Sequence, residues 1–319
     1  MPRSVAFCPA GISSFFETCR RDKDGNPLTD PTRIGARGGG FAIVRGVTSK
    51  VTVKRCDRTR IKIRINSAPS LDAYTTRSAI EQLINENGVT FDVAVDIRVR
   101  VPIAAGFGTS AAGTLASCLA LIEASNLPVT FNEVGRAAHV AEILNGTGLG
   151  TVSALLCGGF VLVREPGAPG TGVIDRLRFP ADHSIVCAYL GPIQTREIFA
   201  KEDHRARYGT AGHATFEAIN KNPTLSAFLA ESRKFGRRAG FETPRITRLI
   251  STMMTAGAIG AAQNMVGEAV HAVVEDSKTA KILRAVRRVF PDAKVFVSTI
   301  DRQGVRFLSE KAKKSTKSA

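Results

Sequence analysis

A run of small residues between a predicted strand and a predicted helix is the segment of this sequence best suited to hold a phosphate. Residues 102–113 read PIAAGFGTSAAG. Small residues let the backbone approach a ligand closely, and the free N–H groups at the start of a helix attract anions. The same pattern also fits a tight turn in which Thr109 or Ser110 is an ordinary helix N-cap.

Two polar residues of a later predicted helix could also take part in chemistry. His139 and Glu142 are three positions apart, so their side chains reach the same surface of the helix. A carboxylate suits a magnesium ion, and an imidazole can donate to an anion. On spacing alone, a structural histidine and a solvated glutamate are the more ordinary interpretations of the pair.

The two segments together resemble a known family. Residues 102–112 are similar to the P-x-x-x-G-L-G-S-S-A-A motif of the GHMP kinases, with Phe107 for Leu and Thr109 for the first Ser. This is not a Walker P-loop, whose lysine is absent. Residues 138–150 resemble the A-H-x-x-E and G-T-G-L-G segments of the archaeal pantoate kinase branch. Segments 9–16, 35–40, 165–172, 191–198 and 263–267 resemble further parts of that branch, in order, through about residue 308.

The resemblance implies ATP and Mg²⁺ as cofactors. It implies that Ser110 and Glu142 are the metal ligands, and the catalytic candidates are Ser110, Glu142 and Thr151. The implied ATP-binding residues are Pro102, Ala105, Gly106, Phe107, Gly108, Thr109, Ser110 and Ala111.

The resemblance also implies an acceptor: pantoate, phosphorylated on its primary hydroxyl to 4-phosphopantoate for coenzyme A biosynthesis. An arginine fork, or hydroxyl and imidazole donors, would bind its carboxylate. The candidates are Arg37, His139, Arg164 and Thr195. Their structural alternatives are, in that order, a loop ion pair, a core histidine, a solvated strand end and a helix N-cap.

Three departures from the branch bear on the acceptor. Thr151 stands where the family has aspartate, the expected general base, and Ala36 replaces a serine. Arg164 is one residue out of step, which in a strand turns a side chain to the other face. The alternatives are therefore a divergent member that acts on another hydroxy acid, or a nucleotide-binding member with little activity. Because Ser110 and Glu142 are both retained, we favour an active kinase, and Thr151 could simply cap the next helix.

The fold that the resemblance implies is α+β with two lobes. Residues 1–178 would form an ATP-binding lobe like ribosomal protein S5 domain 2, residues 179–308 a ferredoxin-like lobe, and residues 309–319 a disordered basic tail. Patterning predicts one sheet from strands 4–8, 41–47, 51–56, 61–65 and 91–101, with helices 72–87, 109–124 and 131–144. Strand 159–164 then ends at a Pro/Gly turn. The second unit is predicted as strand 185–190, a helix-rich part 211–275, helix 278–289 and strands 295–299 and 305–308. Segments 9–16 and 35–40 are predicted loops.

Composition limits the partners. The formal net charge of +16 favours anionic ligands, although part of it lies in the lysine-rich tail and much of the rest on solvated strand edges. With no Trp, three Tyr and no recognisable binding motif, a nucleic-acid partner is not expected. No apolar run approaches the ~20 residues of a membrane span, and the six cysteines are scattered singly. We expect a cytoplasmic protein with reduced thiols and a small-molecule substrate, and a homodimer is left open.

Overall fold

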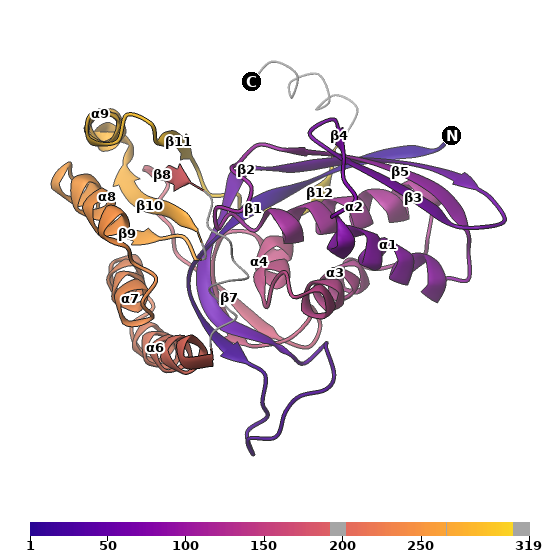
Figure 1. The fold of residues 1–319 in the computed structure, drawn as a ribbon, viewed down its shortest axis with the longest axis horizontal. Helices are drawn as coiled ribbons and strands as arrows, with labels where there is room; N and C mark the ends of the chain where they lie inside the picture. The colour runs from indigo at the N-terminus through magenta and orange to yellow at the C-terminus, as the bar shows by residue number, and fades with distance from the viewer. Residues whose placement is uncertain (192–201, 266, 309–319) are drawn as a thin grey trace.

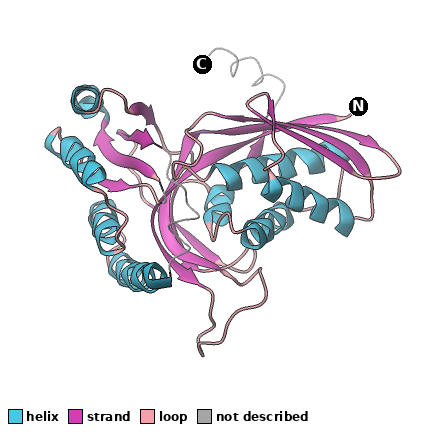
Figure 2. Ribbon diagram, in the orientation of Figure 1, coloured by secondary structure: helices cyan, strands magenta, loops and turns pink. Residues whose placement is uncertain are grey.

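The computed structural model describes residues 1–191, 202–265 and 267–308 and contains two β-sheets, each with its own group of helices (Figures 1 and 2). The first sheet has the order β12-β1-β2-β5-β3-β4, and β6 and β7 extend it from β2. Its strands are β1 (Arg3–Cys19), β2 (Gly35–Arg55), β3 (Arg60–Ile65), β4 (Ala68–Pro69), β5 (Phe91–Val99), β6 (Phe160–Glu165), β7 (Val173–Leu177) and β12 (Arg306–Phe307).

Four helices belong to the first sheet: α1 (Tyr74–Glu86), α2 (Thr109–Ser125), α3 (Phe131–Asn145) and α4 (Thr151–Cys157). α2 is buried almost all round, as its apolar sequence predicts. α3 begins at a capping box, in which Thr130 accepts from the backbone of Glu133 and the Glu133 side chain accepts from Thr130. α3 ends at Gly146, which has the left-handed conformation typical of such a stop.

The second sheet is ferredoxin-like. Its strands are β8 (His183–Gly191), β9 (Gly260–Gln263), β10 (Glu268–Glu275) and β11 (Lys294–Ser298). All its pairs are antiparallel, in the order β11-β8-β10-β9. The remaining helices are α6 (Glu202–Lys221), α7 (Leu225–Arg238), α8 (Pro244–Thr255) and α9 (Thr279–Val289), with a short 3₁₀ turn η1 (Asp276–Lys278) before α9. Helices between β8 and β9 and between β10 and β11 give the β-α-β-β-α-β arrangement.

Several predicted segments differ from the structure. Predicted strands 41–47 and 51–56 are parts of one long β2, which pairs with β6 through residues 38–41 and with β5 through residues 47–55. The predicted loops 9–16 and 35–40 are strand, within β1 and β2. A side chain at Gly40 would collide with the carbonyl of Ile12, so the small residues serve close strand pairing. The end of the predicted helix-rich part 211–275 is the hairpin β9–β10.

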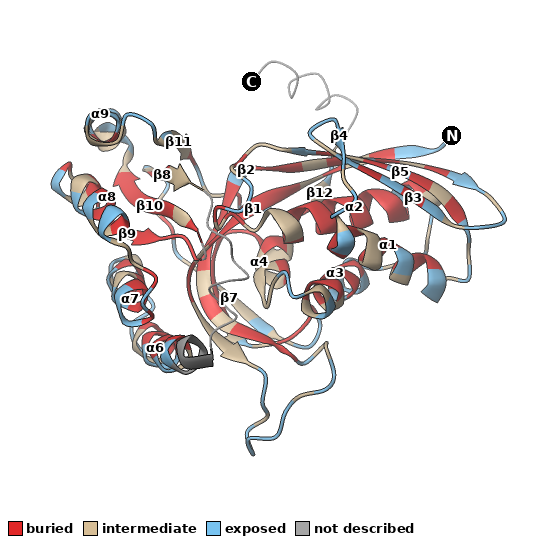
Figure 3. Cartoon of the chain, viewed as in Figure 1, coloured by how far each residue is buried: buried red, intermediate tan, exposed pale blue. Residues whose placement is uncertain are grey.

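An aromatic core lies between the two sheets, where β1 and β2 run through the middle of the molecule (Figure 3). Phe41 stacks on Phe160 at 4.7 Å between ring centroids, and Phe160 meets Phe228 of α7 edge-on at 4.7 Å. Phe15 of β1 meets the same Phe228 ring at 5.7 Å. Because these rings come from β1, β2, β6 and α7, one apolar cluster joins the two halves of the chain.

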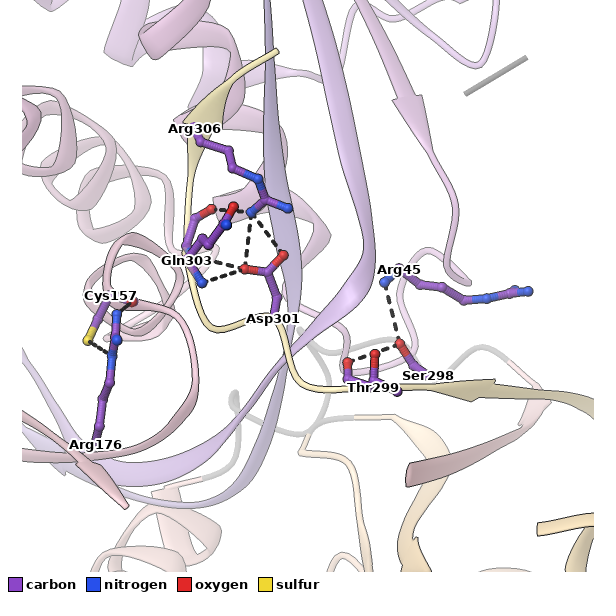
Figure 4. A network of polar contacts seen from close by, with 9 residues as sticks. Arg45, Cys157, Arg176, Ser298, Thr299, Asp301, Gln303 and Arg306 are labelled. Carbon is purple, nitrogen blue, oxygen red and sulfur yellow. Dashed lines mark hydrogen bonds and ion pairs between the residues drawn. The ribbon is translucent and has the colours of Figure 1, made fainter. Parts of the chain in front are cut away.

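After β11 the chain returns to the first sheet, where β12 pairs with β1, so the strand predicted at 305–308 belongs to the first sheet and not to the second unit. Asp301 stabilises the turn between β11 and β12 (Figure 4). Its buried carboxylate accepts from the backbone N–H groups of Gln303 and Gly304, each at 3.0 Å, and pairs with Arg306 at 2.9 Å. No helix in the described ranges has both the length and the apolar character needed to cross a bilayer.

Candidate active site

The loop from β5 into α2 has the backbone of an anion cradle. Ala104, Gly106 and Gly108 have positive φ angles of 57°, 74° and 58°, whereas Ala105 and Phe107 between them do not. Alternation of this kind turns successive N–H groups toward one concave side, which binds anions. α2 follows immediately, and its N-cap is Gly108, with no side-chain cap. Thr109 and Ser110 are therefore not N-caps, and the N–H groups at the start of the helix have no side-chain acceptor there.

Several side chains of this loop are buried in the core. Ala105, Phe107 and Ala111 are each about 1% exposed. The ring of Phe107 lies 5.5 Å from that of Phe296 in β11. Of the predicted ATP-binding residues, these three can therefore offer a ligand only backbone groups. Ser110 is only partly buried.

Ser110 and Glu142 meet, as the resemblance implies. The Ser110 hydroxyl lies close enough to the Glu142 carboxylate to lower its pKa, and the carboxylate accepts from Thr147 Oγ1 at 3.3 Å. Burial raises the pKa of Glu142 to about 7, and the hydroxyls of Ser110 and Thr147 oppose the rise. A side chain at position 148 would collide with the carboxylate, so Gly148 leaves the room that it needs.

The donor set at this point fits a magnesium ion held jointly with a nucleotide. A hydroxyl and one carboxylate are hard oxygen ligands, and Mg²⁺ usually takes one or two carboxylates plus phosphate and water oxygens. The described part of the chain has no cluster of three His, Cys, Asp or Glu suited to a metal. A buried carboxylate whose pKa is raised would also be stabilised in its charged form by a cation.

Thr151 lies beside the cradle and does not cap α4. The N-cap of α4 is Gly150, and no side chain caps it. The predicted capping role is thus wrong: Thr151 is the first helical residue. Its methyl carbon would be 2.7 Å from a β-carbon on Gly108 and 3.1 Å from one on Gly11.

Asn264 and Gly267, which lie between β9 and β10, also pack against the cradle. A β-carbon on Gly106 would lie 2.9 Å from Cβ of Asn264, and one on Gly267 would lie 2.5 Å from the carbonyl carbon of Ala105. The cradle is therefore in contact with β1, with α4 and with the described residues between β9 and β10.

Each of the three acceptor candidates that the structure describes, Arg37, His139 and Arg164, has partners within the protein. His139 is 1% exposed and its Nε2 lies 2.9 Å from the Ile34 carbonyl oxygen. Burial lowers its pKa, so the ring is neutral near pH 7 and Nε2 donates to that oxygen. This is a core histidine that fixes the backbone just before β2. Thr195 lies outside the described residues.

Arg37 is in an ion pair, though in a strand and not in a loop. Its Nη2 lies 2.7 Å from Glu17 Oε2, its guanidinium covers the ring of Phe216 at 4.3 Å, and Nη2 is 3.2 Å from His213 Nδ1. Sequence reasoning missed Glu17, His213 and Phe216, which no motif marks.

Arg164 is partnered and not a solvated strand end. It pairs with Asp175, and its Nη1 donates to Asn220 of α6 at 2.6 Å. The β6–β7 register shifts between Val163 and Glu165, so Arg164 is the extra residue of a bulge. A bulge re-aims a side chain, which accounts for the one-residue offset seen in the sequence.

Basic residues gather on the face of the first sheet near the end of β5. A groove of about 510 Å³ is lined there by Arg3, Lys50, Arg64, Arg98 and Arg100, with Asn66 and Asp96 among its other residues. Asp96 pairs with Arg64 at 2.6 Å. β5 leads directly into the cradle, so this positive face adds to the attraction of an anion toward it.

Comparison with known proteins agrees with this geometry. Residues 73–159 match the family described as GHMP kinases N terminal domain. The chain is 27% identical to a pantoate kinase of Thermococcus kodakarensis, over 86% of this chain and 89% of that protein. It is 27% identical to a pantoate kinase of Methanospirillum hungatei, over 91% and 93%. A solved structure described as a phosphotransferase related to the CoA biosynthesis pathway superposes with a TM-score of 0.85 at 23% identity, covering 96% of this chain and 98% of that one.

Proposed function

We propose that this chain, which belongs to the GHMP kinases, transfers the γ-phosphoryl group of ATP to the primary hydroxyl of pantoate. The observation that carries the proposal is the contact between Ser110 and Glu142 beside a loop whose backbone forms an anion cradle. Similarity over most of the chain to two pantoate kinases supports the choice of acceptor.

The chain's own groups would divide the work of binding. Backbone N–H groups of residues 105–110 would hold the nucleotide phosphates, and Ser110 with Glu142 would hold Mg²⁺. When bound, that ion neutralises phosphate charge. Because phosphoryl transfer depends mainly on positioning and electrostatics, a rigid cradle is itself a large part of the catalyst.

The transfer itself balances simply. The alcohol oxygen forms a bond to the γ-phosphorus, the bond to the bridging oxygen of ADP breaks, and the alcohol proton is released. Thr151 offers no carboxylate to take that proton. The transition state is loose, with little charge on the attacking oxygen, so the proton can leave late to phosphate or water.

For the acceptor, we propose an indirect role for His139. It fixes Ile34, directly before Gly35, Ala36 and Arg37, and would thereby shape the strand start that faces the acceptor. Arg37, Arg164 and Thr195 remain candidates for binding the carboxylate. Ala36 and Thr151 depart from the branch, and this favours a second possibility: a related hydroxy acid as substrate.

A screen for ADP release tests the proposal. Purified protein with Mg²⁺ and ATP is offered pantoate, mevalonate, homoserine or shikimate, with Ser110→Ala as the inactive control. We expect ADP release with pantoate alone and a phosphorus signal for 4-phosphopantoate. Activity with another acceptor and none with pantoate would reassign the substrate, and no ADP release with any would favour a nucleotide-binding protein without turnover.

A further inference from the structure

A chain of three buried polar side chains crosses from the first sheet to the second. Ser14 Oγ lies 3.0 Å from His271 Nε2, and His271 Nδ1 lies 2.9 Å from Asn264 Oδ1. All three residues are 0% exposed. Ser14 belongs to β1, His271 to β10, and Asn264 directly follows β9.

Local backbone features bring the three together. The β1–β2 register shifts between Ser13 and Phe15, so Ser14 is the extra residue of a bulge and its side chain is re-aimed. His271 lies in the middle of β10, opposite Cys187 in β8 and Ala262 in β9.

The imidazole is held neutral by its surroundings. Burial lowers the pKa of His271 to about 3. The His271 and Phe41 rings pack edge to face, with 5.5 Å between their centroids. A neutral imidazole has one donor and one acceptor. With the Asn264 amide oriented as it is, Nδ1–H donates to Oδ1, and Nε2 accepts from the Ser14 hydroxyl. Each ring nitrogen therefore makes one hydrogen bond.

The far end of this chain of contacts bears on the phosphate cradle. Asn264 is the residue that a side chain on Gly106 would strike, at 2.9 Å. The next residue, Met265, donates its N–H to the Ser13 carbonyl at 2.9 Å. Asn264 Nδ2 is buried and has no hydrogen-bond partner among the described residues. The Asn264 side chain is thus oriented by His271 and leaves one donor unused.

We propose that His271 and Asn264 are positioning residues that hold the cradle in its nucleotide-binding conformation, and that Ser14 ties them to β1. The inference rests on the proposed ATP site. Ala104 occupies the left-handed region, which a residue with a β-carbon tolerates only when its surroundings impose it. The packing of Asn264 against Gly106 is one such constraint, because a shift of Asn264 must displace the loop.

Stability alone gives little reason for this network. An apolar group of the same shape, with its partners also replaced, can be as stable as a buried polar pair or more so. What the polar network adds is a single orientation for the side chains in it. That orientation matters where a displacement of about 1 Å is enough to cost a hundredfold in rate, as it can at a site of phosphoryl transfer.

The test is the double variant Ser14→Ala with His271→Phe, which keeps most of the volume and removes the hydrogen bonds. We expect the Kd for a non-hydrolysable ATP analogue and the ATP KM to rise about tenfold, with the acceptor KM within about twofold. His271→Gln, which retains a donor and an acceptor, should recover much of the affinity. Ser232→Ala is the matched control, since Ser232 of α7 is equally buried and its hydroxyl has no hydrogen-bond partner among the described residues.

Calorimetric titration with the ATP analogue, without acceptor, separates failure of this inference from failure of the proposed function. If the wild type binds the analogue and the double variant binds it equally well, the inference is overturned while the proposed function stands. If the wild type binds no nucleotide, the proposed function fails and the inference fails with it. Should the double variant not fold, Asn264→Leu carries the test: it keeps most of the volume but removes the acceptor of the His271 Nδ1–H group, and unchanged affinity would overturn the proposal.

Discussion

A β-carbon on Gly108 would lie 2.7 Å from Cγ2 of Thr151, so the first turn of α4 packs directly against the phosphate cradle. The same methyl would be 3.1 Å from a β-carbon on Gly11. Gly11 also donates its N–H to the Phe107 carbonyl at 3.0 Å. Thr151 therefore contributes a methyl group to the packing of this loop, at the position where the family has a carboxylate.

Gly108→Ala is expected to reduce kcat/KM for ATP by about a hundredfold, because the new methyl strikes Thr151 and φ is left-handed. Adding Thr151→Ser deletes Cγ2 and keeps the hydroxyl, so it should restore part of the activity. Gly88→Ala is the matched control: its φ is 61°, with nothing within 4 Å of the added carbon. Equal activities of the single and double variants would refute the contact.

Ser110→Ala is expected to lower kcat by about a hundredfold or more while the melting temperature stays within a few degrees of wild type. The reason is that this hydroxyl, which lies near the Glu142 carboxylate, is the proposed metal ligand. Steady-state kinetics over a range of Mg²⁺ concentrations would check this. Wild-type turnover at limiting Mg²⁺ would show that the metal assignment is wrong.

Glu142→Gln should abolish turnover yet stabilise the nucleotide-free protein at pH 8. The folded pKa of about 7 lies above the ordinary value of 4.5, so folding favours the protonated carboxyl and wild-type stability falls as pH rises from 4.5 through 7. At about 1.4 kcal/mol per pH unit the effect is at most about 3 kcal/mol. Glutamine resembles the protonated form, so most of the gain should be lost at pH 5. Melting curves at both pH values, without Mg²⁺ or ATP, would decide it; a gain of the same size at both would exclude titration of Glu142 as the cause.

The sequence predicted those parts of the site that depend on local pattern. It could be predicted that segment 102–113 joins a strand to a buried helix, because a run of small residues followed by an apolar helix is recognisable within a short window. The pairing of Ser110 with Glu142 joins two helices, and only the resemblance implied it. The contact of Arg37 with Glu17 depends on the register of β2 against β1, and its contact with His213 depends on how α6 packs on these strands. No periodicity in the sequence encodes either.

Two incorrect secondary-structure predictions have a physical cause. The hairpin β9–β10 was predicted as helix because residues 256–274 are rich in alanine and valine and show no clean alternation, as befits strands buried on both faces. Residues 35–40 were predicted as a loop because they are mostly glycine. In the structure those glycines let strands and Phe228 approach closely: a β-carbon on Gly39 would lie 2.6 Å from that ring.

His139→Ala is expected to raise the acceptor KM by roughly tenfold and the ATP KM by less than twofold. Removing the imidazole leaves the Ile34 carbonyl without its donor and loosens the backbone before Arg37. His139→Gln, which keeps a donor, should be milder. Initial-rate kinetics with each substrate varied in turn would check this, and equal changes in both KM values would count against an acceptor-side role.

Thr151→Ala tests whether the enzyme works without a protein base at this position. A positioned general base typically contributes a factor of about 10²–10⁴ in rate, so removing a catalytic Thr151 hydroxyl would lower kcat by a comparable factor. Its hydroxyl is a poor base, and the structure shows its methyl in contact with the cradle. We therefore expect a loss of no more than about tenfold, attributable to looser packing, whereas Ser110→Ala should lose far more. Kinetics and melting temperatures of the two variants decide the matter together. A hundredfold loss in kcat for Thr151→Ala at unchanged melting temperature would make the hydroxyl catalytic, and an inactive wild type rescued by Thr151→Asp would show that the chain had lost its base and with it useful turnover.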